Sequence, residues 1–215
     1  MTLTLHYHPL SSFCHKALIA LYETGVAFTP KSVNLGDPGE RAAFAAVWPM
    51  AKFPVIEDSA TGETVPEATI IIDYLDRHYP GPARLIPTDP DRARATRLID
   101  RILDLYVHTN MQRVVGDRLR PADGKDPIGV ENARREMSIG YDIVATALGD
   151  KPWMMGDDFT LADCAAAPAL DYAARVHPYA ETHPTLAAYY QRLSARPSYA
   201  RVLKEAEPFR HMFPA

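Results

Sequence analysis

Ser11, Ser12 and Cys14 stand near the amino terminus, where a predicted strand turns into a predicted helix. The first turn of a helix has unpaired backbone N–H groups and a partial positive charge, so it is a favourable place for an anion. A serine hydroxyl at this place can help to hold an anion, or it can serve only as the N-cap of the helix. The segment by itself favours the capping role, and other features must decide between the two.

Tyr7 and Cys14 are alternative groups for the same chemistry. Tyr7 offers a phenolic hydroxyl, but it falls in the alternation Leu3, Leu5, Tyr7, which favours a position in the core. Cys14 lies one helical turn beyond Ser11 on the apolar stripe, where a free cysteine usually packs as a small hydrophobic residue. We therefore take Ser11 as the catalytic candidate and keep Ser12, Cys14 and Tyr7 in reserve.

The elements that must position these residues follow a βαβαββα pattern over the first 79 positions. Apolar runs bounded by turn residues predict strands at 3–7, 28–33, 55–57 and 63–65. Apolar residues at helical spacing predict helices between Cys14 and Gly25, at 40–47 and at 67–79. The first part of the chain is therefore expected to be an α/β domain.

Pro80-Gly81-Pro82, followed by Pro87 and Pro90, is the stretch richest in helix-breaking residues. Beyond it the apolar residues recur only at helical spacing, first along a stripe from Ala95 to Tyr106. We place a domain boundary in this stretch. The prediction is an α/β domain at 1–80 and an all-helical domain at 88–215.

The composition is that of a soluble globular protein. Of 215 residues, 47% are hydrophobic and 23% charged, and the net charge of -4 provides no excess of cations for nucleic acid or for an anionic membrane. The amino terminus lacks the pattern of a signal peptide, so we expect a cytoplasmic protein without membrane partners. The two cysteines and eight histidines show no ligand spacing, so we expect neither a disulfide nor a metal site.

Lys52-Phe53-Pro54-Val55 places a proline at the start of a predicted strand. X-Pro bonds are cis in about 5% of folded cases, so the proline alone does not predict a cis peptide. Its position in the βαβαββα pattern resembles that of the cis-proline of thioredoxin-like folds, which faces the active-site helix. In that superfamily the helix begins with CxxC, whereas this chain has Ser-Ser-Phe-Cys at 11–14, so dithiol redox chemistry is disfavoured.

The segment at 65–75 resembles a glutathione transferase motif in which a Glu-Ser pair precedes an Ala-Ile step and then Tyr-Leu. This chain keeps the glutamate as Glu67 and has Ala68 in place of the serine, which removes a hydroxyl and keeps the backbone N–H. A capping box formed by Thr160 and Asp163 resembles the core motif of the same family. By these motifs the chain is identified as a member of the cytosolic glutathione transferases, of the bacterial type with a serine at the active site.

The resemblance implies a thioredoxin-like first domain, glutathione as co-substrate and no metal. In this family the thiol would be activated by Ser11, the glycyl carboxylate would meet Lys52, and the cysteinyl part would pair with the backbone of Val55. Thr69 would compensate for the missing hydroxyl at Ala68. The implied glutathione-binding residues are Ser11, Lys52, Phe53, Pro54, Val55, Glu67 and Ala68.

The helical domain is expected to hold a small hydrophobic electrophile. Tyr106, Asn110 and Arg113 lie on one face of its first long helix and are the candidates, although core packing is the favoured place for Tyr106. The resemblance also implies a homodimer. Other functions on this fold remain open: an isomerase, a dehalogenase, a disulfide reductase, or a non-catalytic binding or regulatory protein.

Overall fold

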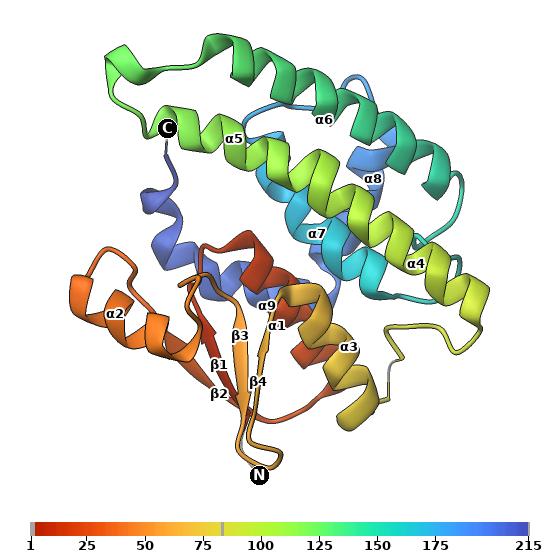
Figure 1. Ribbon diagram of the computed structural model, residues 1–215. Helices are drawn as coiled ribbons and strands as arrows, with labels where there is room; N and C mark the ends of the chain where they lie inside the picture. The colour runs from red at the N-terminus through yellow and green to blue at the C-terminus, as the bar shows by residue number, and fades with distance from the viewer. Residues whose placement is uncertain (1–2, 83, 215) are drawn as a thin grey trace.

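The computed structural model describes residues 3–82 and 84–214. A four-stranded sheet with its helices comes first, and a group of long helices follows (Figure 1). The first part contains β1 (Leu3–Tyr7), α1 (Ser12–Thr24), β2 (Phe28–Ser32), α2 (Pro38–Val47), β3 (Val55–Asp58), β4 (Glu63–Pro66) and α3 (Ala68–His78). This order confirms the predicted βαβαββα pattern.

The sheet has the strand order β2-β1-β3-β4. β1 and β2 run parallel and are connected through α1, whereas β3 runs antiparallel to both β1 and β4. As a result the end of β1 lies beside the start of β3, with His6 opposite Val55, and the end of β4 lies there too, with Pro66 opposite Val55. The chain therefore enters α1 and α3 from the same end of the sheet, where β1 and β4 end and β3 begins.

Both faces of β1 are covered, which corrects the predicted alternation. Leu3 and Leu5 belong to the main core as expected, but His6 is also buried, with 1% of its surface exposed. Its ring stacks on Phe44 of α2 with 5.4 Å between the ring centroids, and its Nε2 lies 2.5 Å from Glu57 Oε2. His6 is buried because α2 covers the face that a half-buried strand would leave to solvent.

Every regular element described after residue 90 is helical, as predicted. The π-helix η1 (Leu103–His108) links α4 (Pro90–Ile102) to α5 (Thr109–Arg118), and the three continue one another along one side of the molecule (Figure 1). The remaining elements are η2 (Ala122–Gly124), α6 (Pro127–Leu148), α7 (Leu161–Ala174), α8 (Pro184–Ala195), α9 (Pro197–Ala206) and η3 (Glu207–Met212). None of the described helices is long and apolar enough to cross a lipid bilayer.

Helix α7 forms the centre of the helical part, and all of its residues from Leu161 to Ala173 are buried. It begins with the predicted capping box, in which Thr160 N donates to Asp163 Oδ2 at 2.8 Å. The Asp163 carboxylate also accepts hydrogen bonds from Met154 N and from the Tyr189 hydroxyl. A fully bonded buried carboxylate stabilises this helix start, so the motif has the structural role expected of it.

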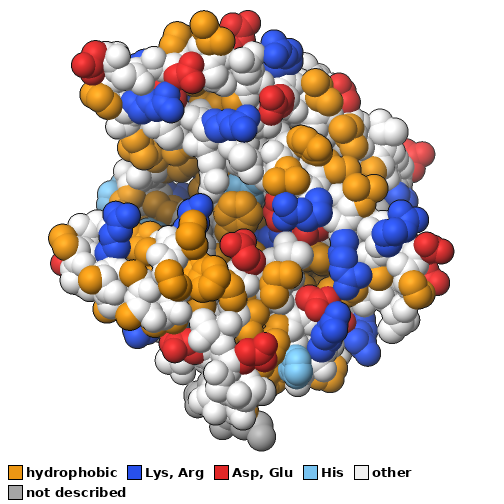
Figure 2. Space-filling model, viewed as in Figure 1, with side chains coloured by type: hydrophobic (Ala, Val, Ile, Leu, Met, Phe, Trp, Pro, Cys, Tyr) orange, Lys and Arg blue, Asp and Glu red, His pale blue; other side chains and the backbone are white. Residues whose placement is uncertain are grey.

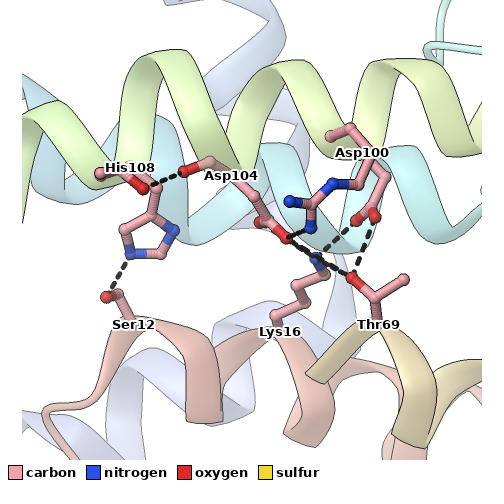
Figure 3. A network of polar contacts seen from close by, with 8 residues as sticks. Ser12, Lys16, Thr69, Asp100, Asp104 and His108 are labelled. Atoms are coloured by element: carbon pink, nitrogen blue, oxygen red, sulfur yellow. Dashed lines mark hydrogen bonds and ion pairs between the residues drawn. The ribbon is translucent and has the colours of Figure 1, made fainter. Parts of the chain in front are cut away.

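A buried ion cluster joins the first part of the chain to the helical part (Figure 3). Lys16 of α1 is fully buried, and its Nζ lies 2.5 Å from Asp100 Oδ1 and 2.9 Å from Asp104 Oδ2. Thr69 of α3 accepts a hydrogen bond from Lys16 Nζ at 2.8 Å and donates to Asp100 Oδ2 at 2.9 Å. Because a buried charge without its partner is strongly destabilising, the cluster favours one arrangement of α1, α3 and α4.

Candidate active site

A cavity of about 490 Å³ opens where the end of the sheet from which the chain enters α1 and α3 faces α5. Figure 2 shows the hollow between the region of α2 and helix α5. Its walls come from the start of α1, the loops before α2 and β3, the start of α3, and α5. The lining residues are Ser11, Phe13, Leu35, Ala51, Lys52, Phe53, Pro54, Glu67, Ala68, Thr109 and Gln112. Apart from Val55, every residue implied to bind glutathione lines this cavity.

The turn that carries Ser11 is held by its own backbone and by the helical part. Ser11 N donates to His8 O at 2.9 Å, which closes the turn before α1. The Tyr172 hydroxyl of α7 donates to Leu10 O at 2.9 Å, so the central helix of the second part anchors the loop. The position of Ser11 on the cavity wall therefore depends on both parts of the chain.

Ser11 is the N-cap of α1, and its hydroxyl oxygen accepts a hydrogen bond from Cys14 N at 3.3 Å. A serine hydroxyl has one proton and two oxygen lone pairs. The capping bond occupies a lone pair and leaves the proton able to donate to another group. Capping and anion binding are therefore compatible at this residue.

The Phe53–Pro54 peptide bond is cis, as the resemblance implied, and both residues line the cavity. Lys52 is exposed on the same wall. Val55 is placed differently from the prediction, because it is fully buried and has strand neighbours on both sides, His6 and Pro66. Phe53 lies outside β3 and borders the cavity.

Two residues on the cavity wall have a strained backbone. Glu67 has a φ of 69° and Ala51 a φ of 46°, and non-glycine residues rarely adopt such values. No other non-glycine residue in the described chain has a positive φ. Strain of this kind costs on the order of 1–3 kcal/mol per residue and clusters at functional sites.

The start of α3 also lies on the cavity wall. Glu67 is the N-cap of this helix, yet it makes no side-chain capping bond, and its side chain is exposed. The N–H groups that begin with Ala68 therefore receive no cap from Glu67, which suits them to bind an anionic group. Thr69 does not compensate for Ala68 as expected, because its hydroxyl bonds to Lys16 and Asp100 in the buried ion cluster.

The three reserve candidates do not line the cavity. Cys14 is fully buried, and burial raises the pKa of its thiol to about 12, so the thiol stays protonated near neutral pH. Tyr7 packs against the main core, and burial raises the pKa of its hydroxyl. Ser12 is buried and forms a hydrogen bond with Nε2 of His108. Ser11 alone among these candidates borders the cavity.

The predicted electrophile residues lie outside the cavity lining. Tyr106 is 48% exposed rather than packed in the core, and the buried Asn110 donates its amide to Tyr106 O at 2.8 Å. Arg113 pairs with Glu136 of α6 at 3.4 Å, so this face of the helix is turned toward α6. Thr109 and Gln112 of α5 line the cavity instead.

Sequence reasoning missed five lining residues: Phe13, Leu35, Ala51, Thr109 and Gln112. Phe13 could have been found, because it lies in the first turn of the helix that Ser11 caps. Thr109 and Gln112 follow a π-helix for which the sequence shows no signal. Leu35 and Ala51 lie in loops. An alanine in the sequence gives no indication of a left-handed backbone such as that of Ala51.

Another cavity, of about 510 Å³, lies around Arg84, Arg92 and Arg196. Each of these arginines already pairs with a carboxylate, from Asp76, Asp158 and Glu23 respectively. None of the residues predicted to act in the site lines it. Among residues 3–82 and 84–214, no group of three or more His, Cys, Asp or Glu side chains is placed to hold a metal ion.

Comparison with known proteins agrees with this fold. Residues 5–83 match the glutathione S-transferase N-terminal domain, and residues 103–197 match the glutathione S-transferase C-terminal domain. A crystal structure of a glutathione S-transferase from Methylobacterium radiotolerans, in complex with glutathione sulfonate, superposes with a TM-score of 0.84. It is 30% identical in sequence, and the match covers 94% of each chain.

Two curated relatives carry the names of isomerases. The maleylpyruvate isomerase of a Ralstonia species is 27% identical over 92% of this chain and 95% of its own length. The maleylacetoacetate isomerase of Pseudomonas aeruginosa is 26% identical over 97% of this chain and 98% of its own length. With both domains matched and the fold shared, the chain belongs to the glutathione S-transferase family.

Proposed function

We propose that this protein binds glutathione in the 490 Å³ cavity and activates its thiol for attack on a small electrophile. The observation that carries the proposal is the position of Ser11, whose hydroxyl caps α1 on the cavity wall beside Pro54 and the start of α3. The relative from Methylobacterium radiotolerans, crystallised with glutathione sulfonate, supports the choice of thiol.

The two ends of glutathione carry different charges, and the cavity has a group for each. Glu67 pairs with the amino group of the γ-glutamyl end, and the N–H of Ala68 binds its carboxylate at the start of α3. Lys52 meets the glycyl carboxylate. Between them the backbone of Phe53 binds the cysteinyl part, which brings the sulfur to Ser11.

Ser11 acts on the ionisation of the thiol. A free thiol has a pKa near 8.5, so only a few per cent is thiolate at neutral pH. A hydrogen bond to a charged group contributes about 1.5–3 kcal/mol, and each unit of pKa lowering requires about 1.4 kcal/mol. The Ser11 hydroxyl, helped by the positive end of α1, therefore lowers the thiol pKa by about one to two units. The thiolate then attacks an electrophilic carbon held near Thr109 and Gln112.

A glutathione-dependent isomerase is the second candidate function. The names of the two curated isomerases, which match over more than nine-tenths of this chain, favour it. In such a reaction the same thiolate adds to a conjugated cis double bond, the resulting single bond rotates, and the thiolate leaves. Glutathione is consumed in the transfer reaction and regenerated in the isomerisation.

Retention on immobilised glutathione and turnover of substrates, each compared with Ser11→Ala, test these functions. We expect the wild type to be retained on immobilised glutathione. A transferase would turn over a chlorinated nitrobenzene and consume free thiol, whereas an isomerase would turn over maleylpyruvate and leave the amount of free thiol unchanged. We expect Ser11→Ala to be retained but to lose about 10- to 100-fold in kcat/KM. Retention without any turnover that depends on Ser11 would instead indicate a non-catalytic binding protein.

We also propose that the protein is a homodimer that uses the face of α3, α4 and η1. Ile70, Leu98, Leu105 and Tyr106 are each between 45% and 54% exposed on these neighbouring elements. Figure 2 shows apolar side chains interspersed with charged ones over this face. Sedimentation equilibrium of the wild type should give twice the chain mass, and Leu105→Asp should give the monomer.

A further inference from the structure

We infer that His108 is a positioning residue that holds the first turn of α1, and with it the Ser11 hydroxyl, in the geometry needed to meet the thiol. This inference rests on the proposed function. It assigns to the helical part of the chain an influence on Ser11 that acts through Ser12 and Phe13.

His108 contacts the two residues that follow Ser11. It is fully buried at the end of η1, and a hydrogen bond joins its Nε2 to the hydroxyl of Ser12, the first residue of α1. Its ring stacks on Phe13, with 4.1 Å between the ring centroids and 10° between the planes. Phe13 lines the cavity next to Ser11. The His108 ring therefore holds Ser12 through a hydrogen bond and Phe13 through stacking.

The neighbouring ion cluster sets the register of these contacts (Figure 3). Ser12 and Lys16 are four residues apart on α1, and their partners His108 and Asp104 are four residues apart on η1. A slip of η1 along α1 by one residue would break the hydrogen bond and the ion pair together. The π-helix also places Thr109, which lines the opposite wall of the cavity, directly after His108. The contact between His108 and Ser12 thus connects the cavity wall at the start of α1 with the wall formed by α5.

The surroundings of His108 argue for positioning rather than proton transfer. Burial lowers the pKa of its imidazole to about 3, with the positive charge of Lys16 and the neighbouring His15 adding to the effect. The ring is therefore neutral at any pH at which the thiol reacts. It does not line the cavity, and its Nδ1 is buried without a hydrogen-bond partner among the described residues. His108 can act on the thiol only through Ser12 and Phe13.

Three variants separate the two contacts. His108→Phe keeps a ring against Phe13 and removes the hydrogen bond to Ser12. His108→Gln keeps a donor and an acceptor near the position of Nε2 and removes the ring. Ser12→Ala removes the hydrogen bond from the other side, so the double variant Ser12→Ala/His108→Phe should be no worse than the more impaired of its two single variants.

The pH dependence of thiol ionisation in bound glutathione, followed by ultraviolet absorbance, is the decisive readout. We expect His108→Phe and Ser12→Ala to raise its midpoint by about one unit and to lower kcat/KM about tenfold near pH 6.5. The loss should shrink above about pH 8.5, where glutathione ionises without help. His108→Gln should restore most of the midpoint. Amide hydrogen exchange at residues 11–15 should rise in His108→Phe and not in His108→Gln.

A purely structural role would change the fraction of folded protein and leave the midpoint where it is. Binding of glutathione by His108→Phe with an unchanged midpoint and unchanged exchange would overturn the inference, while a defect in Ser11→Ala would still uphold the proposed function. A wild type that fails to bind glutathione would overturn the proposed function and this inference with it.

Discussion

In the proposed function, the Ser11 hydroxyl serves the fold and the chemistry together. As the N-cap of α1 it accepts a hydrogen bond from Cys14 N, and its proton remains able to donate into the cavity. From the sequence, capping and catalysis stood as competing explanations of this serine. The geometry makes them compatible, because they use different parts of the same hydroxyl group.

Cys14 provides a prediction at the scale of the residue. We expect Cys14→Ala to leave kcat/KM within about twofold of wild type, because the thiol is fully buried and its pKa is raised to about 12. Urea unfolding should show a loss of about 1–2 kcal/mol, since the substitution leaves a small cavity. The native protein should also resist alkylation near pH 7. If Cys14→Ala abolished turnover while Ser11→Ala did not, the cysteine would replace the serine in the mechanism.

At the scale of the element, much of the candidate site is formed by the first turns of helices. The starts of α1 and α3 lie at the same end of the sheet because β3 runs antiparallel to both β1 and β4. The strand and helix pattern of the sequence predicted these elements, and the resemblance to the glutathione transferases implied that Ser11, Pro54 and Glu67 belong to one site. It is one cavity that all three residues line. The pattern could not predict that Val55 pairs on both sides within the sheet, because pairing depends on which strands become neighbours.

The predicted electrophile residues do share one helix face, because Asn110 bonds to Tyr106 O and Arg113 bonds to Asn110 Oδ1. That face is turned toward α6 and not toward the cavity. Helical spacing predicts which residues share a face, but not which neighbouring element the face will contact. Hydrophobic spacing also gave no sign of the role of Thr69, since its partners Lys16 and Asp100 lie on two other helices, 53 and 31 residues away in the chain.

Gln112 and Arg113 form a matched pair that tests the position of this helix. Gln112 lines the cavity and Arg113 pairs with Glu136 on the other side, although the two are adjacent in sequence. We expect Gln112→Ala to change the KM for the electrophile by about three- to tenfold and to leave the KM for glutathione nearly unchanged. Arg113→Ala should change neither by more than about twofold. Steady-state kinetics with both substrates varied would show the reverse order if the helix were rotated.

At the scale of the whole molecule, the two parts of the chain are joined by buried polar groups as well as by apolar packing. Lys16, Asp100 and Asp104 form the ion cluster, and His108 bonds to Ser12 beside it. The apolar spacing of the sequence predicted both the sheet and the helices. It did not predict the contact between them, because a charged side chain at helical spacing is usually an exposed one.

The buried histidines predict a dependence of stability on pH. Burial lowers the pKa of His15 to about 4 and that of His108 to about 3, below the value of about 6.5 in the unfolded chain. The unfolded state therefore binds more protons between these values, so stability is retained above about pH 6.5 and lost as the pH falls. Two histidines should remove about 2–4 kcal/mol between about pH 6.5 and 5. Urea unfolding measures this loss.

His108→Phe provides the control for that experiment. It removes one of the two titrating rings, so its stability should fall by about half as much over the same range of pH. A wild-type stability that stays constant from about pH 6.5 to 5 would mean that neither ring is held neutral in the folded protein.

The ionisation of glutathione bound to the wild type and to Ser11→Ala tests the central claim most directly. Titration of thiolate absorbance should place the midpoint of the wild-type complex about one to two units below the value of about 8.5 for a free thiol. In Ser11→Ala it should move back toward that value. A wild-type midpoint equal to that of free glutathione, or one that Ser11→Ala leaves unchanged, would contradict the role of Ser11.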